Sequence, residues 1–197
     1  MRGAAILAGG MGRRMGKPKL FLKRGNLYLY KFLYDELGKS IGRVTIVLSK
    51  ELSLPEPVPG LEVLYDDDGY SGSGPLGGLY TALVEMKGEF LFVCSVDMPF
   101  VSGNLAAYLI DRLESSGEEC LIPFVEGKPH PLCAAYRKRG AGKIRKSLDE
   151  GEFRVSSLLS RLDSSLVGED ELRADGISID SFANINTPGD IKKFFSN

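Results

Sequence analysis

Short apolar runs, separated by glycine-rich or polar links, dominate the first hundred residues of the chain. Four runs have the length of strands, at residues 3–7, 44–48, 61–65 and 90–96. Apolar residues at helical spacing predict three helices, at about 28–37, 79–86 and 105–113. Gly38 is placed to end the first of these helices. This alternation of strand and helix predicts an α/β fold, with a mostly parallel sheet covered by helices on both faces.

The pattern changes beyond residue 113. Residues 121–125 and 132–136 predict an antiparallel hairpin, and residues 138–162 predict one or two polar helices. Thr187, Pro188 and Asp190 are typical of a helix start and predict a last helix after an extended piece at 183–186. Residues 20–23 are expected to be extended before the turn at Gly25. With no linker or repeat in view, we predict a single Rossmann-like three-layer domain over residues 1–197.

Composition narrows the class of protein. The chain has 197 residues and a net charge of −1, so no nucleic-acid or membrane partner is expected. No signal-peptide pattern or long apolar segment is present, and a cytoplasmic location is expected. The chain has three cysteines, an odd number, and they lack CxxC spacing. Neither a zinc site nor a disulfide framework is therefore expected. The positive charge at residues 13–24 is therefore local, which suits a small anionic ligand.

The loop at residues 9–19 is the first candidate for chemistry. It follows the first predicted strand and combines four glycines with four cations. Glycines allow backbone N–H groups to approach a phosphate, and Arg or Lys supplies the opposite charge. Neither common phosphate motif fits, because Met11 and Pro18 depart from the P-loop and Met15 departs from the dinucleotide fingerprint.

The whole string Leu-Ala-Gly-Gly-x-x-x-Arg-Met-Gly-x-x-Lys resembles the signature loop of the nucleotidyltransferases that activate sugars and cofactors with an NTP. The Leu-Ala-Gly-Gly version resembles the molybdenum cofactor guanylyltransferases, whereas relatives that use cytidine or uridine nucleotides more often have Leu-Ala-Ala-Gly. The resemblance implies catalytic roles for Arg14 and Lys19, with Lys17 as an alternative to Lys19 and Arg13 on the surface. It also implies a set of nucleotide-binding residues in the loop: Leu7, Ala8, Gly9, Gly10, Gly12 and Lys19.

Aspartates follow two of the predicted strands. In a parallel sheet the carboxyl ends of strands lie at one edge, where ligands bind, so these aspartates are expected to converge with the glycine loop. Asp97 precedes Met-Pro and resembles the family's catalytic, metal-binding aspartate, which implies Mg²⁺ as the cofactor. From the residues alone, Asp97 equally fits a turn cap. Asp66 resembles the aspartate that contacts the nucleoside, with Asp67 left open as an alternative.

Two further segments resemble family elements. Gly74 begins a Gly-Pro-Leu-Gly-Gly stretch whose following helix start would suit a ligand anion. Asn184 and Asn186 belong to an Asn-x-Asn-Thr-Pro element, and the resemblance implies that this element binds ligand. His130 matches a His-Pro pair in the family's hairpin, but a lone histidine is more often structural, and we do not expect acid–base catalysis from it.

The resemblance implies transfer of GMP from GTP to the terminal phosphate of molybdopterin, with release of pyrophosphate. Molybdoenzymes or cofactor-delivery proteins are further partners that it suggests. Three alternatives remain open at this point: a cytidylyltransferase acting on molybdopterin, a guanylyltransferase acting on a corrinoid precursor, and a non-catalytic protein that binds a nucleotide or molybdopterin. Residues 138–182 match no known pattern, and part of the acceptor site is expected there.

Overall fold

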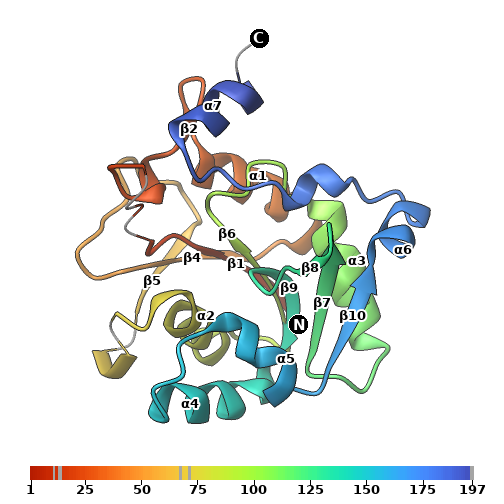
Figure 1. The fold of residues 1–197 in the computed structure, drawn as a ribbon. Coiled ribbons are helices and arrows are strands. Elements are labelled where there is room, and N and C mark those ends of the chain that lie inside the picture. The colour runs from red at the N-terminus through yellow and green to blue at the C-terminus, as the bar shows by residue number, and fades with distance from the viewer. Residues whose placement is uncertain (11, 13–14, 67, 71, 196–197) are drawn as a thin grey trace.

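The computed structural model describes residues 1–10, 12, 15–66, 68–70 and 72–195. The strands of its central sheet are β1 (Arg2–Leu7), β4 (Val44–Leu48), β5 (Glu62–Tyr65), β6 (Phe90–Ser95), β7 (Cys120–Val125), β8 (Lys128–Pro129), β9 (Cys133–Arg137) and β10 (Ser164–Gly168). Their order is β10-β7-β9-β6-β1-β4-β5, with β8 paired to β7 (Figure 1). β9 runs antiparallel between β6 and β7, whereas the β10–β7, β6–β1, β1–β4 and β4–β5 pairs are parallel.

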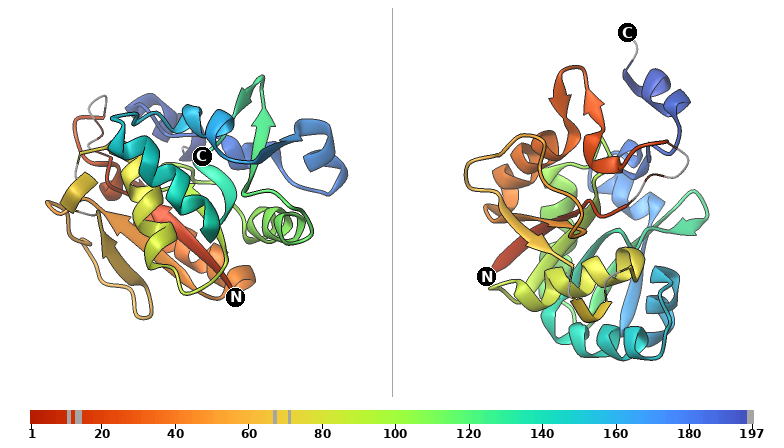
Figure 2. Two further views of the ribbon diagram at one scale, coloured as in Figure 1. Left: turned by 90° about the horizontal axis from the view of Figure 1, so that it is seen from below. Right: turned by 90° about the vertical axis from the view of Figure 1, so that its left-hand side faces the viewer.

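Helices cover both faces of this sheet, as Figures 1 and 2 show. The helices are α1 (Leu29–Ile41), α2 (Gly74–Glu85), α3 (Gly103–Glu114), α4 (Ala141–Asp149), α5 (Leu158–Arg161), α6 (Glu169–Ala174) and α7 (Pro188–Phe195). α1 and α3 pack on one face, and α2, α4 and α5 pack on the other. The predicted three-layer α/β class with a mostly parallel sheet and an antiparallel hairpin is confirmed.

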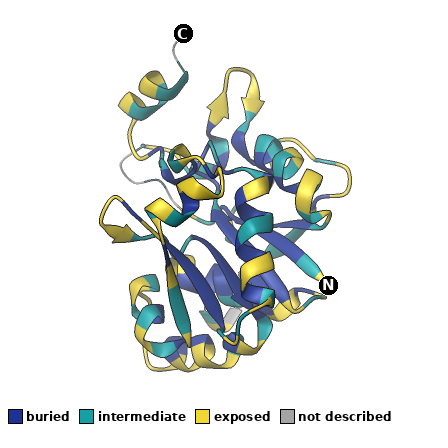
Figure 3. Ribbon diagram, turned by 90° about the vertical axis from the view of Figure 1, so that its right-hand side faces the viewer, coloured by how far each residue is buried: buried dark blue, intermediate teal, exposed yellow. Residues whose placement is uncertain are grey.

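The two faces of β1 contribute to two separate cores. Ala4 and Ile6 lie in the core beneath α1 and α3, whereas Ala5 and Leu7 lie in the core beneath α2 and α4. This division follows from the two-residue period of a strand, which sends successive side chains to opposite faces. Figure 3 shows the resulting arrangement, with buried strands in blue and exposed outer helix faces in yellow. Because it is packed on both faces, the sheet holds the residues at its edge in place.

Two predicted helix boundaries were wrong. α1 continues past Gly38 and ends at Gly42, whose φ of 81° places it in the left-handed region that glycine adopts at helix ends. α2 begins at Gly74, five residues before the predicted start, with Pro75 in its first turn. Gly78 in that first turn packs close to the Asp66 carboxylate, so tertiary contacts outweigh the poor helix propensity of this stretch.

Among the described residues, the C-terminal half contains two strands that the sequence pattern did not predict, the short β8 and β10. β7 and β9 form the expected antiparallel pair, and α4 and α5 are the expected polar helices. β10, however, pairs in parallel with β7 at the edge of the sheet. Its residues Ser164–Gly168 are mostly polar or exposed. This segment therefore lacks the apolar run by which a buried strand is predicted.

The segment after the glycine loop also differs from the prediction. Residues Lys19–Phe21 form a turn of 3-10 helix, and the extended part is a small ribbon of β2 (Lys23–Arg24) and β3 (Leu27–Tyr28). The predicted start of α7 is confirmed, with Pro188 as its first residue. Within the described residues, no helix is both long and apolar enough to cross a membrane.

Candidate functional site

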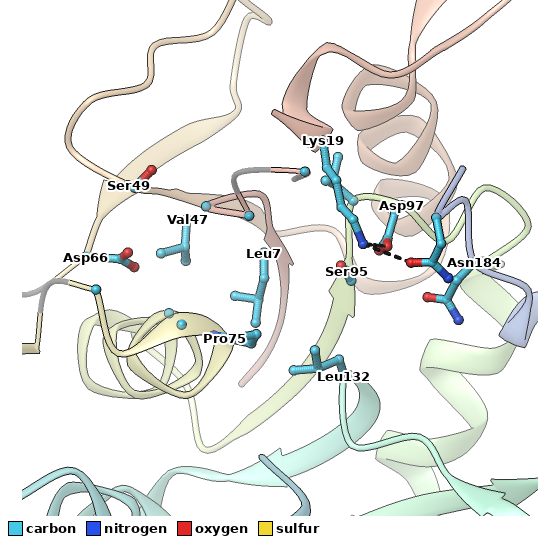
Figure 4. A pocket seen from close by; sticks show the side chains of 18 of the residues that line it. Leu7, Lys19, Val47, Ser49, Asp66, Pro75, Ser95, Asp97, Leu132 and Asn184 are labelled. Atoms are coloured by element: carbon cyan, nitrogen blue, oxygen red, sulfur yellow. Dashed lines mark hydrogen bonds and ion pairs between the residues drawn. The ribbon is translucent and has the colours of Figure 1, made fainter. Parts of the chain in front are cut away.

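A cavity of about 920 Å³ lies at the carboxyl ends of β1, β4, β5 and β6. Most of the described residues that the sequence nominated line it (Figure 4). They come from five separate parts of the chain: Leu7, Gly9, Gly10, Gly12, Lys19, Asp66, Gly74, Asp97, Asn184 and Asn186. The volume lies within the range of small-molecule sites. The expected convergence of strand ends is therefore present in the structure.

Lys19 and Asp97 form the centre of one side of this cavity. The Lys19 ammonium group donates a hydrogen bond to Asp97 Oδ2 and lies 3.3 Å from Asn186 Oδ1 (Figure 4). Asp97 is only 2% exposed, although it carries a carboxylate. The backbone holds the group in place, because Ile185 N donates to Asp97 O at 2.9 Å. This bond joins the end of β6 to the segment that carries both asparagines.

The second oxygen of Asp97 bears on metal binding. Oδ1 is buried and has no hydrogen-bond partner among the residues that the structure describes. A buried carboxylate oxygen without a partner is costly, and a bound cation would satisfy it. No group of three or more His, Cys, Asp or Glu is arranged to hold a metal among the described residues. The single carboxylate of Asp97 suits Mg²⁺, which is commonly held by one or two carboxylates together with phosphate oxygens and water.

Asp66 and Ser49 lie on the opposite side of the cavity (Figure 4). Burial, with a smaller effect of Glu51, raises the pKa of Asp66 from 3.8 to about 6. The Ser49 hydroxyl is buried and has no hydrogen-bond partner among the described residues. Gly9 lies between them, since a Cβ built there would stand 3.4 Å from Ser49 N and 3.6 Å from Asp66 Oδ2. This part of the cavity presents hydrogen-bonding groups around a narrow gap.

The glycine loop folds tightly over the cavity. Gly12 has a φ of 55°, and a Cβ there would lie 2.0 Å from the Lys17 carbonyl oxygen, so only glycine fits. Lys19 N donates to Gly10 O at 3.2 Å, which places the Lys19 side chain beside Gly10. Arg14, which was predicted as a second catalytic cation, lies outside the described residues, as do Arg13 and Asp67.

The first turn of α2 forms another part of the cavity wall. Gly74 and Pro75 line the cavity, and the preceding residue, Ser73, makes no side-chain cap to the helix. Helix N-termini carry unpaired N–H groups and a partial positive charge. This end of α2 thus adds favourable electrostatics for an anion beside the glycine loop.

Asp190 is a positioning residue that the sequence analysis treated only as part of a helix start. Its Oδ2 accepts hydrogen bonds from Asn186 N at 2.9 Å and Thr187 N at 2.8 Å. These bonds lower the pKa of the Asp190 carboxyl. They fix the backbone of Asn186 at the point where its side chain meets Lys19. The signal available in the sequence was the capping pattern itself.

One predicted site residue is not part of the cavity. Ala8 is fully buried in the core beneath α1, and its N–H bonds to Val47 O at 2.9 Å. As the residue after Leu7, it points to the opposite face of the strand end. His130 is also not a lining residue; it is buried, its ring lies 5.0 Å from that of Phe182, and burial lowers its pKa.

Several lining residues were not anticipated, among them Ser49, Glu51, Ser95 and Leu132. Ser49 had a usable signal, since it directly follows the strand at 44–48 and the strand-end rule applies to it equally. Ser95 is the last residue of β6, and Asp97 follows it in the turn beyond the strand end, so both line the cavity. Leu132 had no local signal, because the antiparallel placement of β9 brings it there.

Comparison with known proteins agrees with this geometry. The family model of the MobA-like NTP transferase domain matches residues 4–165. The chain is 32% identical over 191 residues to a probable molybdenum cofactor guanylyltransferase of Bacillus subtilis, covering 94% of this chain and 90% of that protein. A protein of the same name from Methanosarcina acetivorans is 32% identical over 202 residues, covering 97% and 88%.

Among solved structures, the molybdopterin-guanine dinucleotide biosynthesis protein A of Archaeoglobus fulgidus superposes with a TM-score of 0.83 at 28% identity. The match covers 98% of this chain and 96% of that one. Both the matched family model and the full-length similarity include the strand ends that form the cavity. The chain therefore belongs to the MobA-like NTP transferase family, and it is a nucleotidyltransferase.

Proposed function

We propose that this protein transfers GMP from GTP to the terminal phosphate of molybdopterin, which forms molybdopterin guanine dinucleotide and releases pyrophosphate. The names of its relatives support guanylyl transfer in molybdenum cofactor biosynthesis. The observation that carries the proposal is the Lys19–Asp97 pair at the wall of a nucleotide-sized cavity, with one buried carboxylate oxygen that has no partner among the described residues. Such a pair provides a cation for phosphate and a carboxylate for a metal.

The nucleotide would occupy the cavity from one side to the other. Guanine would lie near Gly9, Ser49 and Asp66, because its N1–H and N2 amine are donors that suit the acceptor oxygens of Asp66. The phosphates would lie between the glycine loop and the first turn of α2, where backbone N–H groups and the helix dipole favour negative charge. The acceptor would then approach from the side of Ser95, Leu132 and Asn184.

The chemistry needs no general base. A phosphate monoester has a second pKa of about 6, so its oxygen is already ionised near neutral pH. This oxygen attacks the α-phosphorus, a new P–O bond forms, and the bond to the β-phosphate oxygen breaks with its electron pair leaving on pyrophosphate. Lys19, and Arg14 by family resemblance, would stabilise the developing charge. When bound to Asp97, Mg²⁺ would supply further charge neutralisation at the phosphates.

Two further proposals concern the domain organisation of the chain and the partners of the protein. One continuous sheet flanked by two cores favours a single nucleotidyltransferase domain over residues 1–197. We also propose that the product passes to molybdoenzymes or to cofactor-delivery proteins, because the released dinucleotide is a cofactor. The net charge of −1 favours neither nucleic acid nor an anionic membrane as a partner.

Pyrophosphate release tests the proposal. The purified protein is incubated with Mg²⁺ and GTP, CTP, ATP or UTP, with and without molybdopterin, and the Asp97→Asn variant serves as the inactive control. We expect release only with GTP and molybdopterin together. Release with CTP would assign the protein to cytidylyl transfer. In a further incubation with GTP and a corrinoid precursor, release that molybdopterin does not produce would identify the corrinoid as the acceptor. Tight nucleotide binding without any release would make it a non-catalytic carrier.

A further inference from the structure

A second cavity of about 560 Å³ lies outside the catalytic one, between the β2–β3 ribbon and α7. The right-hand view of Figure 2 shows these two elements side by side, the ribbon in orange-red and the helix in blue. An apolar cluster lies beside these two elements: Met15, Ile191 and Phe195 pack against the buried Leu22 and Leu29, which flank the ribbon in sequence. We call this cavity the ribbon–helix groove.

Three lysines converge on the groove. Lys17 comes from the glycine loop, Lys23 from the ribbon and Lys192 from α7. None of the three makes an ion pair with a described residue, whereas Lys19, Lys31 and Lys143 each do. No Asp or Glu is found among the described residues that line the groove. In a chain with a net charge of −1, this is a local excess of positive charge.

The groove also has aromatic walls. Phe21, Tyr28 and Phe195 line it together with the lysines. The Lys23 ammonium lies over the Tyr28 ring, 4.1 Å from its centroid, and a cation–π contact of this kind holds the charge at the edge of the groove. Tyr28 in turn stacks on Tyr30, with centroids 5.5 Å apart. The site is thus a partly apolar slot with fixed positive charge at its rim.

We propose that the ribbon–helix groove is a second ligand site, which binds a ring compound that carries a phosphate. The lysine ammonium groups would bind the phosphate, and the aromatic side chains would pack against a flat ring of the ligand. Inorganic phosphate has no ring and would leave these aromatic side chains without a contact. The groove volume lies within the range of small-molecule sites. A phosphorylated pterin and a nucleotide share this chemistry, and the experiment below distinguishes the two sources.

The two walls of the groove continue into the catalytic cavity. Lys17 is in backbone contact with Gly12, which lines that cavity. α7 begins two residues after Asn186, which contacts Lys19 and is held by Asp190 of the same helix. A ligand that bridges Lys17 and Lys192 would therefore brace the glycine loop against the segment that carries Asn186. The inference does not depend on which nucleotide the catalytic cavity accepts.

Amide NMR on the whole protein tests the proposal. Groove residues Gly25 and Lys192 and cavity residues Gly9 and Gly78 report separately on the two sites. The probes are 6-hydroxymethylpterin phosphate and GMP, their phosphate-free parents 6-hydroxymethylpterin and guanosine, and inorganic phosphate, which lacks a ring. We expect saturable shifts at Gly25 and Lys192 with at least one ring phosphate, at lower concentration than with any of the three partial probes. The ring phosphate that binds identifies the source.

Paired variants locate the site. Lys23→Gln combined with Lys192→Gln should weaken binding in the groove at least tenfold, while the shifts at Gly9 and Gly78 persist. Lys87→Gln combined with Lys193→Gln removes the same charge from exposed lysines outside the groove and should leave binding unchanged. Melting temperatures confirm that both pairs fold. The proposal is overturned if no ring phosphate shifts the groove amides up to millimolar concentration, if inorganic phosphate binds equally well, or if both variant pairs lose affinity alike.

Discussion

Lys19 bonds to one oxygen of the buried Asp97 carboxylate, and the other oxygen has no hydrogen-bond partner within the described part of the chain. The two residues are 78 positions apart in sequence and meet because the glycine loop folds back over the carboxyl end of β6. The ion pair balances the charge of the Asp97 carboxylate at the wall of the cavity. The free oxygen leaves the carboxylate ready to bind a cation, and the predictions below depend on this division of roles.

Asp97→Asn should lower turnover at least ~100-fold, because preorganised electrostatic groups at a reacting phosphate are typically worth that much. The fold should persist, since the amide has the same shape and Lys19 is partly exposed to solvent. The measurement is the steady-state rate at saturating Mg²⁺, with circular dichroism as the check on folding. Asp35→Asn, an exposed aspartate on α1, is the matched control. Near-normal turnover would remove Asp97 from the mechanism.

Lys19→Ala should weaken binding of GTP more than binding of GMP. The cation lies beside Gly10 in the glycine loop, along which we place the outer phosphates that GMP lacks. Calorimetric dissociation constants for both nucleotides give the comparison, and Lys87→Ala controls for the loss of one positive charge. Equal losses for GTP and GMP would place Lys19 away from the outer phosphates.

GTP with Mg²⁺ should raise the melting temperature more than CTP, UTP or ATP. A ligand at 100 times its dissociation constant stabilises the folded state by about 2.7 kcal/mol, so a tenfold preference is measurable by this method. Gly9→Ala should reduce the preference, because its methyl group would enter the gap between Ser49 and Asp66. Gly142→Ala, on α4, is the matched control, since a Cβ there would meet nothing within 4 Å. A larger shift with CTP on the unmodified protein would contradict guanine selection.

GTP affinity should decrease as the pH falls through about 6, where burial places the pKa of Asp66. Below that pH the carboxyl is protonated and loses an acceptor for the guanine N–H groups. Asp66→Asn should bind GTP weakly and without this pH dependence. The test is the dissociation constant between pH 5 and 8, and an unchanged pH profile in the variant would show that another group titrates.

The same raised pKa has a consequence for the stability of the ligand-free protein. The folded state holds the Asp66 proton more tightly than the unfolded chain, so the free energy of unfolding should fall as the pH rises from about 4 to about 6. At pH 7.5, Asp66→Asn should therefore be more stable than the unmodified protein. Because the side chain is only half-buried, we discount the effect to about 1 kcal/mol. Urea unfolding of both proteins at pH 4 and 7.5 measures it, and a parallel decline in both would assign the decline to other groups.

Asp190→Ala should raise the KM for substrate while changing stability by only about 1 kcal/mol, as expected for loss of a helix cap. Without Asp190, the amides of Asn186 and Thr187 lose their acceptor and the Asn186 side chain loses its fixed position beside Lys19. Asp180→Ala, an exposed aspartate before α7, is the control. A KM equal to that of the unmodified protein would reduce Asp190 to a structural cap.

The sequence alone determined the layers of the fold and the chemistry at the strand ends. The continuous apolar run in β1 specifies a strand buried on both faces, and strand–helix alternation specifies parallel pairing, because those patterns follow from local geometry. The same rule places Gly9, Asp66 and Asp97 at one edge. The Leu-Ala-Gly-Gly loop, by resemblance, carried the family assignment.

The tertiary structure decided what depends on contacts between distant residues. β10 forms because β7 offers it a partner, although its own residues lack a strand pattern. The early start of α2 depends on the close fit of Gly78 against Asp66, and the raised pKa of Asp66 depends on its burial. The pairing of Lys19 with Asp97 likewise exists only once the loop closes over the sheet. Packing, burial and long-range pairing are properties of the assembled chain, and no local pattern of residues encodes them.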